Sequence, residues 1–161
     1  MKRTCIAVVD ATRARLFTYE LEGPREHLIE HTDLVNPARR LRPSELFSDS
    51  RPGTSRTGGL QYAFDDHREH HLDEMDAVFA RQISEQIQDL VKSSLATRFI
   101  LCASPNMLGH LREVLRVEIP MDELAHDYVK LTPAQLRDHL ETHGLLPPKP
   151  PRPGMTAPPG H

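Results

Sequence analysis

Cysteine, tryptophan and long apolar runs are what this 161-residue chain has least of: it holds two cysteines and no tryptophan. Cys5 and Cys102 both lie in apolar stretches and do not show the C-x-x-C spacing of metal clips and redox pairs. Their surroundings indicate buried thiols in a reducing compartment. The apolar run at residues 5–9 is too short for a signal-peptide core or a membrane span. We therefore expect a soluble, cytoplasmic protein with no membrane partner.

An overall excess of positive charge is also missing. The net charge is −3 and the isoelectric point is about 6.4, which argues against a protein whose whole surface coats nucleic acid. A local excess exists, because residues 36–57 hold five arginines and two acidic residues. Guanidinium groups bind phosphate through two parallel hydrogen bonds, and nearby aromatic rings such as Tyr62 can stack on unpaired bases. An ordinary polar loop is the alternative. The predicted RNA-binding residues are Arg39, Arg40, Arg42, Arg51, Arg56 and Tyr62.

Turn residues divide the first half of the chain into three strands and a loop. β-rich runs are followed by Gly and Pro punctuation, which predicts an antiparallel meander. Periodicity is then lost until a helical pattern starts at Asp66 and continues for roughly 26 residues. The predicted strands span residues 4–10, 13–21 and 27–35, and the predicted long basic loop spans residues 36–64.

The second half of the chain alternates strands and helices. The apolar run 98–103 predicts a strand covered on both faces, and Ser104 is expected to cap the helix that follows. A fifth strand is predicted within residues 119–129. The last helix starts with a capping box at Thr132 and ends at His143-Gly144. We expect one domain over residues 1–144 and a Pro-rich, polyproline-like or disordered tail over 145–161.

The resulting order, β-β-β-α-β-α-β-α, predicts an α/β protein with a ribonuclease-H-like mixed five-stranded sheet flanked by helices. Such a sheet pairs its first and fourth strands. Cys5 and Cys102 should then lie on adjacent central strands with buried thiols.

Four ordered stretches carry a resemblance to a known family. The segments "IAVVDATRARLF", "SDSRPG", "LCASPNMLGHLREVL" and "HDYVKLTPAQLRDHL" resemble the bacterial host attachment protein family over roughly residues 4–141. That family in turn resembles the middle domain of the peptide-chain release factor and of Pelota. The resemblance implies a ribonuclease-H-like fold and a link to translation.

The release-factor resemblance draws attention to Gly58, Gly59 and Gln61. In the release factor a Gly-Gly-Gln tip precedes a long helix and promotes hydrolysis of the ester that joins peptide to tRNA. Glycines at such a tip would let backbone N–H groups approach the reacting carbonyl closely. Here Leu60 separates Gly59 from Gln61 and shifts the register of the glutamine by one residue. A flexible turn with an incidental glutamine is therefore the favoured interpretation.

The sequence also contains candidate residues for a metal site and for a nuclease site. His67, His71 and Glu74 share a helix face at metal-ligand spacing, but they fit no zinc motif, and an exposed polar helix face is favoured. A two-metal nuclease needs three acids. Asp10 could supply the first and either Glu69 or Asp73 the second, but the fourth strand, "RFILCASPN", does not supply the third. Asp10 is instead expected to close the first hairpin or pair with an arginine, and Asp127 to act as a cap or ion-pair partner. No cofactor and no metal are expected.

These observations favour a non-catalytic, translation-associated binding module, with a stress, ribosome hibernation or rescue role, that uses the basic loop on ribosomal or transfer RNA. A peptidyl-tRNA hydrolase-like rescue enzyme acting through Gly58, Gly59 and Gln61 is one alternative. The other is an attachment-related interaction protein whose Pro-rich tail docks on a protein partner. The sequence does not fix the oligomeric state.

Overall fold

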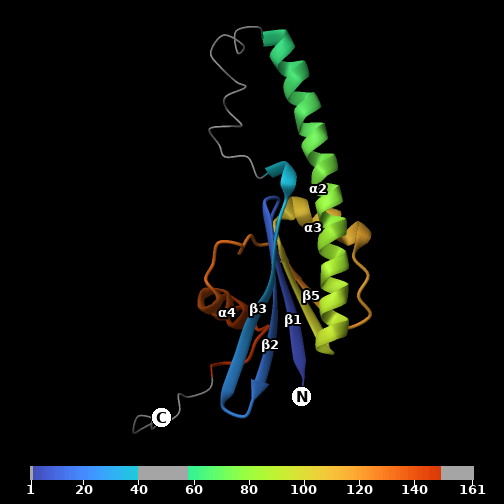
Figure 1. The fold of residues 1–161 in the computed structure, drawn as a ribbon. Helices are drawn as coiled ribbons and strands as arrows, with labels where there is room; N and C mark the ends of the chain where they lie inside the picture. Colours follow the sequence, from blue (N-terminus) through green and yellow to red (C-terminus); the bar gives the residue numbers. More distant parts are fainter. Residues whose placement is uncertain (1, 40–57, 150–161) are drawn as a thin grey trace.

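A computed structural model describes residues 2–39 and 58–149 of the chain, with side chains described for residues 2–39 and 71–149. Five strands form one mixed sheet in the spatial order β3-β2-β1-β4-β5 (Figure 1). The first three strands pair antiparallel, whereas β4 runs parallel to β1 and β5 parallel to β4. This arrangement confirms the predicted ribonuclease-H-like order. The strands are β1 (Arg3–Val9), β2 (Arg13–Glu22), β3 (Arg25–Val35), β4 (Arg98–Ala103) and β5 (Met121–Leu124).

Helices cover both faces of the sheet (Figure 1). α2 (Gly58–Ser94) and α3 (Pro105–Val114) pack on one face, and α4 (Pro133–Thr142) packs on the other. Alternate residues of β1 therefore enter two different cores: Val9 faces α2 and α3, while Val8 faces α4. A strand buried on both faces needs a continuous apolar run, which explains why β1 and β4 show no alternation of polar and apolar residues.

The two cysteines lie on the neighbouring central strands β1 and β4, as predicted. Both side chains are fully buried, and both thiols are free. Burial raises the pKa of Cys5 and the pKa of Cys102 to about 12, because a thiolate would lose its hydration. These thiols are therefore structural groups, protonated at neutral pH, in the interior of the sheet.

Local sequence signals set most helix boundaries. α3 starts with Pro105 after Ser104, although the Ser104 side chain makes no cap hydrogen bond. At α4 the predicted capping box is present: Thr132 Oγ1 accepts from the Gln135 amide at 3.2 Å, and Gln135 Oε1 accepts from the Thr132 amide at 3.0 Å. α4 ends at Thr142, His143 is its C-cap, and Gly144 follows with a φ of +73°. The proline, the capping box and the terminal glycine thus act where the sequence predicted them.

The start of α2 was predicted wrongly. The helix begins at Gly58, not at Asp66, so the expected loop over 36–64 ends at residue 57. Two glycines weaken a helix, but each further residue adds one backbone hydrogen bond once a helix exists, and residues 60–65 contain no breaker. At the other end of that loop, residues 37–39 form the 3-10 helix η1 (Pro37–Arg39). The predicted arginines at positions 40, 42, 51 and 56 lie outside the described residues.

The start of the Pro-rich tail belongs to the packed domain. Leu146 is buried against α4 and the sheet, and the Leu145 amide donates to the Leu140 carbonyl at 2.9 Å. The carbonyl of Pro147 accepts from the Arg137 guanidinium. The domain therefore continues past Gly144 as far as the chain is described. Among the described helices, none combines the length and the apolar composition that crossing a membrane requires.

Candidate nucleic-acid interface

A buried polar cluster lies where the Arg-rich segment starts. Asp76 on α2 is fully buried, and so is Asn36, directly after β3. The Asp76 carboxylate accepts from Arg39 Nη2 at 2.8 Å and from Arg39 Nε at 3.3 Å. It also accepts from Asn36 Nδ2 at 2.9 Å. A buried carboxylate needs such a cation and such donors, because burial removes its hydration. We call Asn36, Arg39 and Asp76 the anchor cluster.

The anchor cluster also holds the first hairpin. Asn36 Nδ2 donates to the Ala11 carbonyl at 2.8 Å, and the Asn36 amide donates to the Thr12 carbonyl at 2.9 Å. The side-chain oxygen of Asn36 accepts from the Ala38 amide at 3.1 Å, which starts η1. The chain is therefore fixed to the sheet and to α2 immediately before residue 40 (Figure 1).

Arg39, one of the predicted RNA-binding residues, pairs with Asp76, and about one third of its side chain is exposed. The structure therefore gives this arginine a role in holding the chain, and its predicted contact with phosphate stays a prediction. The four other predicted arginines, at positions 40, 42, 51 and 56, lie outside the described residues. Tyr62 lies in the first turns of α2, and its side chain lies outside the described part.

The glycines and the glutamine at the start of α2 do not form a loop tip. Gly58, Gly59 and Gln61 are all helical residues of α2. Their backbone conformation is therefore that of a first helical turn, where the N–H groups point along the helix axis. A tip that curls its amides around a reacting carbonyl needs a different backbone path.

The histidines of the weak metal hypothesis lie on α2. His71 and Glu74 have exposed side chains, and Glu74 has an interaction partner, while the His67 side chain is outside the described part. In the ranges where side chains are described, no three His, Cys, Asp or Glu residues gather as metal ligands.

Asp10 closes the first hairpin, as predicted. Its Oδ1 accepts from the amides of Thr12 and Arg13, each at 2.8 Å, and from the Thr12 hydroxyl at 2.7 Å. Asp127 accepts from the Val129 amide at 3.2 Å. Burial and the neighbouring Asp10 carboxylate raise the pKa of Asp127. Asp10 and Asp127 lie near the carboxyl end of β1. The chain leaves β1 through a hairpin and leaves the neighbouring β4 through α3. Open α/β sheets bind ligands at such a point.

Of the two α2 acids considered for nuclease chemistry, Asp73 pairs with a histidine, and the side chain of Glu69 lies outside the described part. Asp73 lies 3.0 Å from His110 Nε2 on α3. The α2 acid that reaches the hairpin is Asp76, which sequence reasoning missed. Its signal was a carboxylate at helical spacing between two apolar residues of the predicted helix, four positions after Leu72 and three before Phe79.

The strand order of the mixed sheet and the helices on its two faces place the chain among α/β proteins of the ribonuclease-H-like class. A family model described as "Protein required for attachment to host cells" matches residues 5–140. The chain therefore belongs to that host attachment family.

Solved structures show more distant likenesses. The type II variant of the Aquifex aeolicus Ppx/GppA phosphatase gives a TM-score of 0.45 at 10% identity, covering 76% of this chain and 36% of that one. The archaeal translation termination factor aRF1 gives 0.33 at 14% identity, covering 88% and 39%. A structure described only as an archaeal protein gives 0.32 at 13% identity, covering 88% and 38%. The chain spans less than two fifths of each, and likenesses at this level say nothing about activity. No curated protein matches the chain.

Proposed function

We propose that the protein is a non-catalytic binding module that contacts ribosomal or transfer RNA through the segment 40–57. The observation that carries this proposal is the anchor cluster, because it ties the N-terminal flank of the segment to α2, the helix with which the C-terminal flank is continuous. The segment leaves the fold at Arg39, which is bound to Asp76 on α2, and it re-enters the fold at Gly58, the first residue of α2. A charged segment held at both ends loses less conformational entropy on binding than a free tail would.

The composition of the segment suits phosphate. Residues 40–57 contain four arginines and two acids, Glu45 and Asp49, which gives a local charge of +2 on a chain of net charge −3. Arginine presents a planar fork of donors that matches two phosphate oxygens. Four such groups can release roughly 3 counterions when they bind the backbone of a nucleic acid.

Binding is favoured over catalysis because three described carboxylates already have partners within the fold. Asp76 is neutralised by Arg39, Asp73 faces His110, and Asp10 accepts three hydrogen bonds within its own hairpin. A general base or a metal ligand needs a carboxylate that is free to meet substrate. Each of these three has a structural partner instead.

The test is the salt dependence of binding to purified ribosomes and to tRNA. A variant with Arg40, Arg42, Arg51 and Arg56 replaced by Ala should bind more weakly, and its plot of log K against log salt should be shallower by up to about 3. The control carries four charge-matched Ala replacements at exposed cations outside the segment. These are Arg25, Arg81, Lys92 and Lys130.

The control should keep nearly the whole salt slope, because it keeps the arginines of the segment. If binding depended only on the total charge of the protein, both variants would be weakened alike. Equal affinity of the segment variant and the unmodified protein, with native thermal unfolding, would contradict RNA binding and favour a protein partner. Release of peptide from a peptidyl-tRNA complex, lost in the Gly59→Ala/Gln61→Ala variant, would contradict the non-catalytic assignment. We expect no release.

A further inference from the structure

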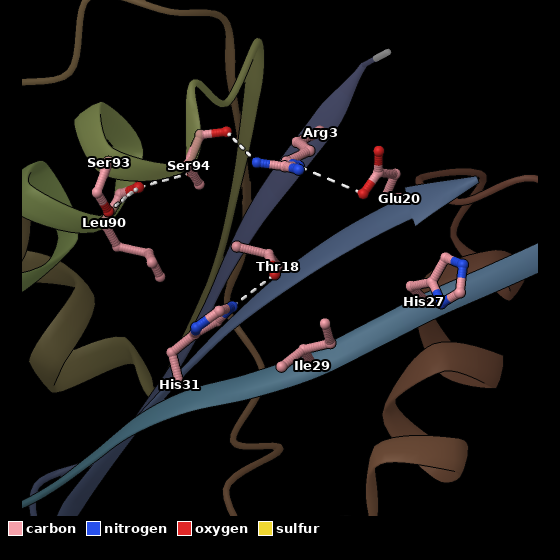
Figure 2. Close-up of a pocket in the computed structure, with 9 residues that line it drawn as sticks. All are labelled: Arg3, Thr18, Glu20, His27, Ile29, His31, Leu90, Ser93 and Ser94. Carbon is pink, nitrogen blue, oxygen red and sulfur yellow. Dashed lines mark hydrogen bonds and ion pairs between the residues drawn. The ribbon is translucent and has the colours of Figure 1, made fainter. Parts of the chain in front are cut away.

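A pocket opens at the opposite end of the sheet from the anchor cluster. It lies on the α2 face, where the helix ends and leaves the outer ends of β2 and β3 uncovered (Figures 1 and 2). Its volume is about 270 Å3, enough for a small organic molecule. The walls come from three strands and one helix, with Arg3, Thr18, His27, Ile29, His31 and Ser94 among the lining residues.

A β-bulge presents one of the pocket histidines. The pairing of β2 with β3 shifts between Leu16 and Phe17, so that His31 is the extra residue on β3. Its Nε2 lies 2.6 Å from the hydroxyl of Thr18, which is buried (Figure 2). The threonine thus orients the imidazole, and the other ring nitrogen is left for a ligand. Bulges re-aim side chains in this way next to binding sites.

Arg3 supplies a fixed cation on the other side of the pocket. Its Nη1 donates to the Ser94 carbonyl at 3.1 Å, and its Nε donates to Glu20 at 3.3 Å (Figure 2). Within the described residues its Nη2 has no hydrogen-bond partner. A guanidinium positioned by two other contacts can offer this nitrogen to an anion with little further loss of entropy.

Apolar groups complete the lining of the pocket, and a strained residue follows its last α2 residue, Ser94. The Ile29 side chain is 51% exposed at the pocket, opposite Thr18 in the sheet register, and Leu90 contributes from α2. α2 ends at Ser94, and the next residue, Leu95, has a φ of 57° and is 78% exposed. This conformation is costly for a leucine, and strain of this kind is concentrated at functional sites. By ending the helix there, Leu95 leaves the Ser94 carbonyl free for Arg3.

We infer that this pocket binds a small molecule in which a phosphate or carboxylate group is joined to a short apolar chain. The anionic group contacts Arg3 and His31, and the apolar chain lies on Ile29 and Leu90. A hydrogen-bonded anion and one apolar anchor are the usual elements of a small-ligand site. This inference is independent of RNA binding, because the pocket and the anchor cluster lie at opposite ends of the sheet.

Few charged or titratable groups line the pocket. They are Arg3, Glu20, His27 and His31, and His27 also lies 3.7 Å from Glu22. The α2 wall adds Leu90 and two serines, which carry no charge.

The experiment is a two-dimensional NMR titration of the full chain with butyl phosphate and with butyrate, using butylamine as the cationic control. Resonances of Thr18, Ile29 and Ser94 should shift with at least one anionic probe below about 20 mM. Comparing the two anions distinguishes phosphate from carboxylate. In His31→Gln the affinity should fall about tenfold, the effect of one charge-assisted hydrogen bond.

The matched control is His126→Gln, a histidine exposed beyond the opposite face of the sheet, which should leave the affinity unchanged. If His31→Gln unfolds, Ile29→Asp replaces it and should also weaken binding of both anions. Absence of shifts in the pocket resonances with either anion would overturn the inference. Equal response to butylamine, or unchanged affinity in folded His31→Gln, would do so as well.

Discussion

The most constrained single side chain in the described structure is the Asp76 carboxylate. It is fully buried on a helix that buries mostly apolar groups, and among the described side chains Arg39 supplies the compensating positive charge within hydrogen-bond distance. A pair of this kind adds little stability compared with an apolar replacement, but the loss of one partner is expensive. The main effect of the pair is therefore to fix the position of Arg39, after which the segment 40–57 starts.

Replacement of Arg39 by Ala should lower the free energy of unfolding by about 2 kcal/mol, because it leaves Asp76 buried with only the Asn36 amide. The figure is below the value for a fully buried pair, since the Arg39 side chain is partly exposed. The double variant Arg39→Ala/Asp76→Asn should recover part of the loss. Urea denaturation measures both. Arg25→Ala, at an exposed arginine, serves as the control and should change stability by less than about 0.5 kcal/mol. A wild-type midpoint for Arg39→Ala would show that the pair is not coupled to folding.

At the scale of elements, the C-terminal ends of α2 and α4 share one backbone feature, a left-handed residue just after the helix. α4 is followed by Gly144 in the left-handed region, whereas α2 is followed by Leu95 in that region. The Leu95 conformation is set by the chain reversal into β4, where the Ala96 amide donates to the Val91 carbonyl at 3.1 Å. Glycine is the residue that adopts this conformation without a steric cost.

Leu95→Gly should therefore raise the free energy of unfolding by about 1 kcal/mol, and Gly144→Ala should lower it by about the same amount. The Leu95 side chain is mostly exposed, and an added Cβ at Gly144 meets nothing within 4 Å, so neither change involves a packing term. Thermal unfolding measures both shifts. Leu95→Ala, which keeps the Cβ, is the control and should be near neutral. A loss of stability in Leu95→Gly would mean that the leucine has a packing role.

Elements whose ends carry a chemical signal could be predicted from the sequence, and elements whose ends depend on tertiary contacts could not. The proline and the capping box gave the starts of α3 and α4, and β1 and β4 followed from their continuous apolar runs. The start of α2 was missed because glycine propensity is a weak guide once helix propagation is possible. His31 was missed as a pocket residue because a bulge arises from strand pairing, which a single strand does not reveal. Asp76 could have been found, since it interrupts an apolar stripe.

At the scale of the whole molecule, the sheet separates two proposed activities. The anchor cluster lies at one end of the sheet, and the pocket with Arg3 and His31 lies at the other. On the face opposite to α2, one buried arginine joins the edge strand to the last helix. Arg137 Nε donates to both carboxylate oxygens of Glu26 on β3 at 3.0 Å, and the same guanidinium contacts Glu141 and the Pro147 carbonyl.

This arginine makes the docking of α4 dependent on pH. Burial by itself would raise the pKa of Glu26, but hydrogen bonds from Arg137 and Tyr19, together with the Arg137 charge, lower it below its ordinary value of 4.5. A carboxyl group whose pKa is lower in the folded chain than in the unfolded chain stabilises the fold when ionised. Its contribution is complete above the unfolded pKa of 4.5 and is lost as pH falls through the folded pKa.

Glu26→Gln should therefore flatten the loss of stability on acidification. Between about pH 5 and pH 3 the unmodified protein should lose more free energy of unfolding than the variant, whereas at pH 7 the variant should be the less stable of the two, because Arg137 then lacks its carboxylate. Urea denaturation at a series of pH values measures the difference. Glu85→Gln, at an exposed position on α2, should leave the whole profile unchanged. If Glu26→Gln and the unmodified protein lose stability in parallel below pH 4.5, the ion pair with Arg137 does not control how α4 is held on the sheet.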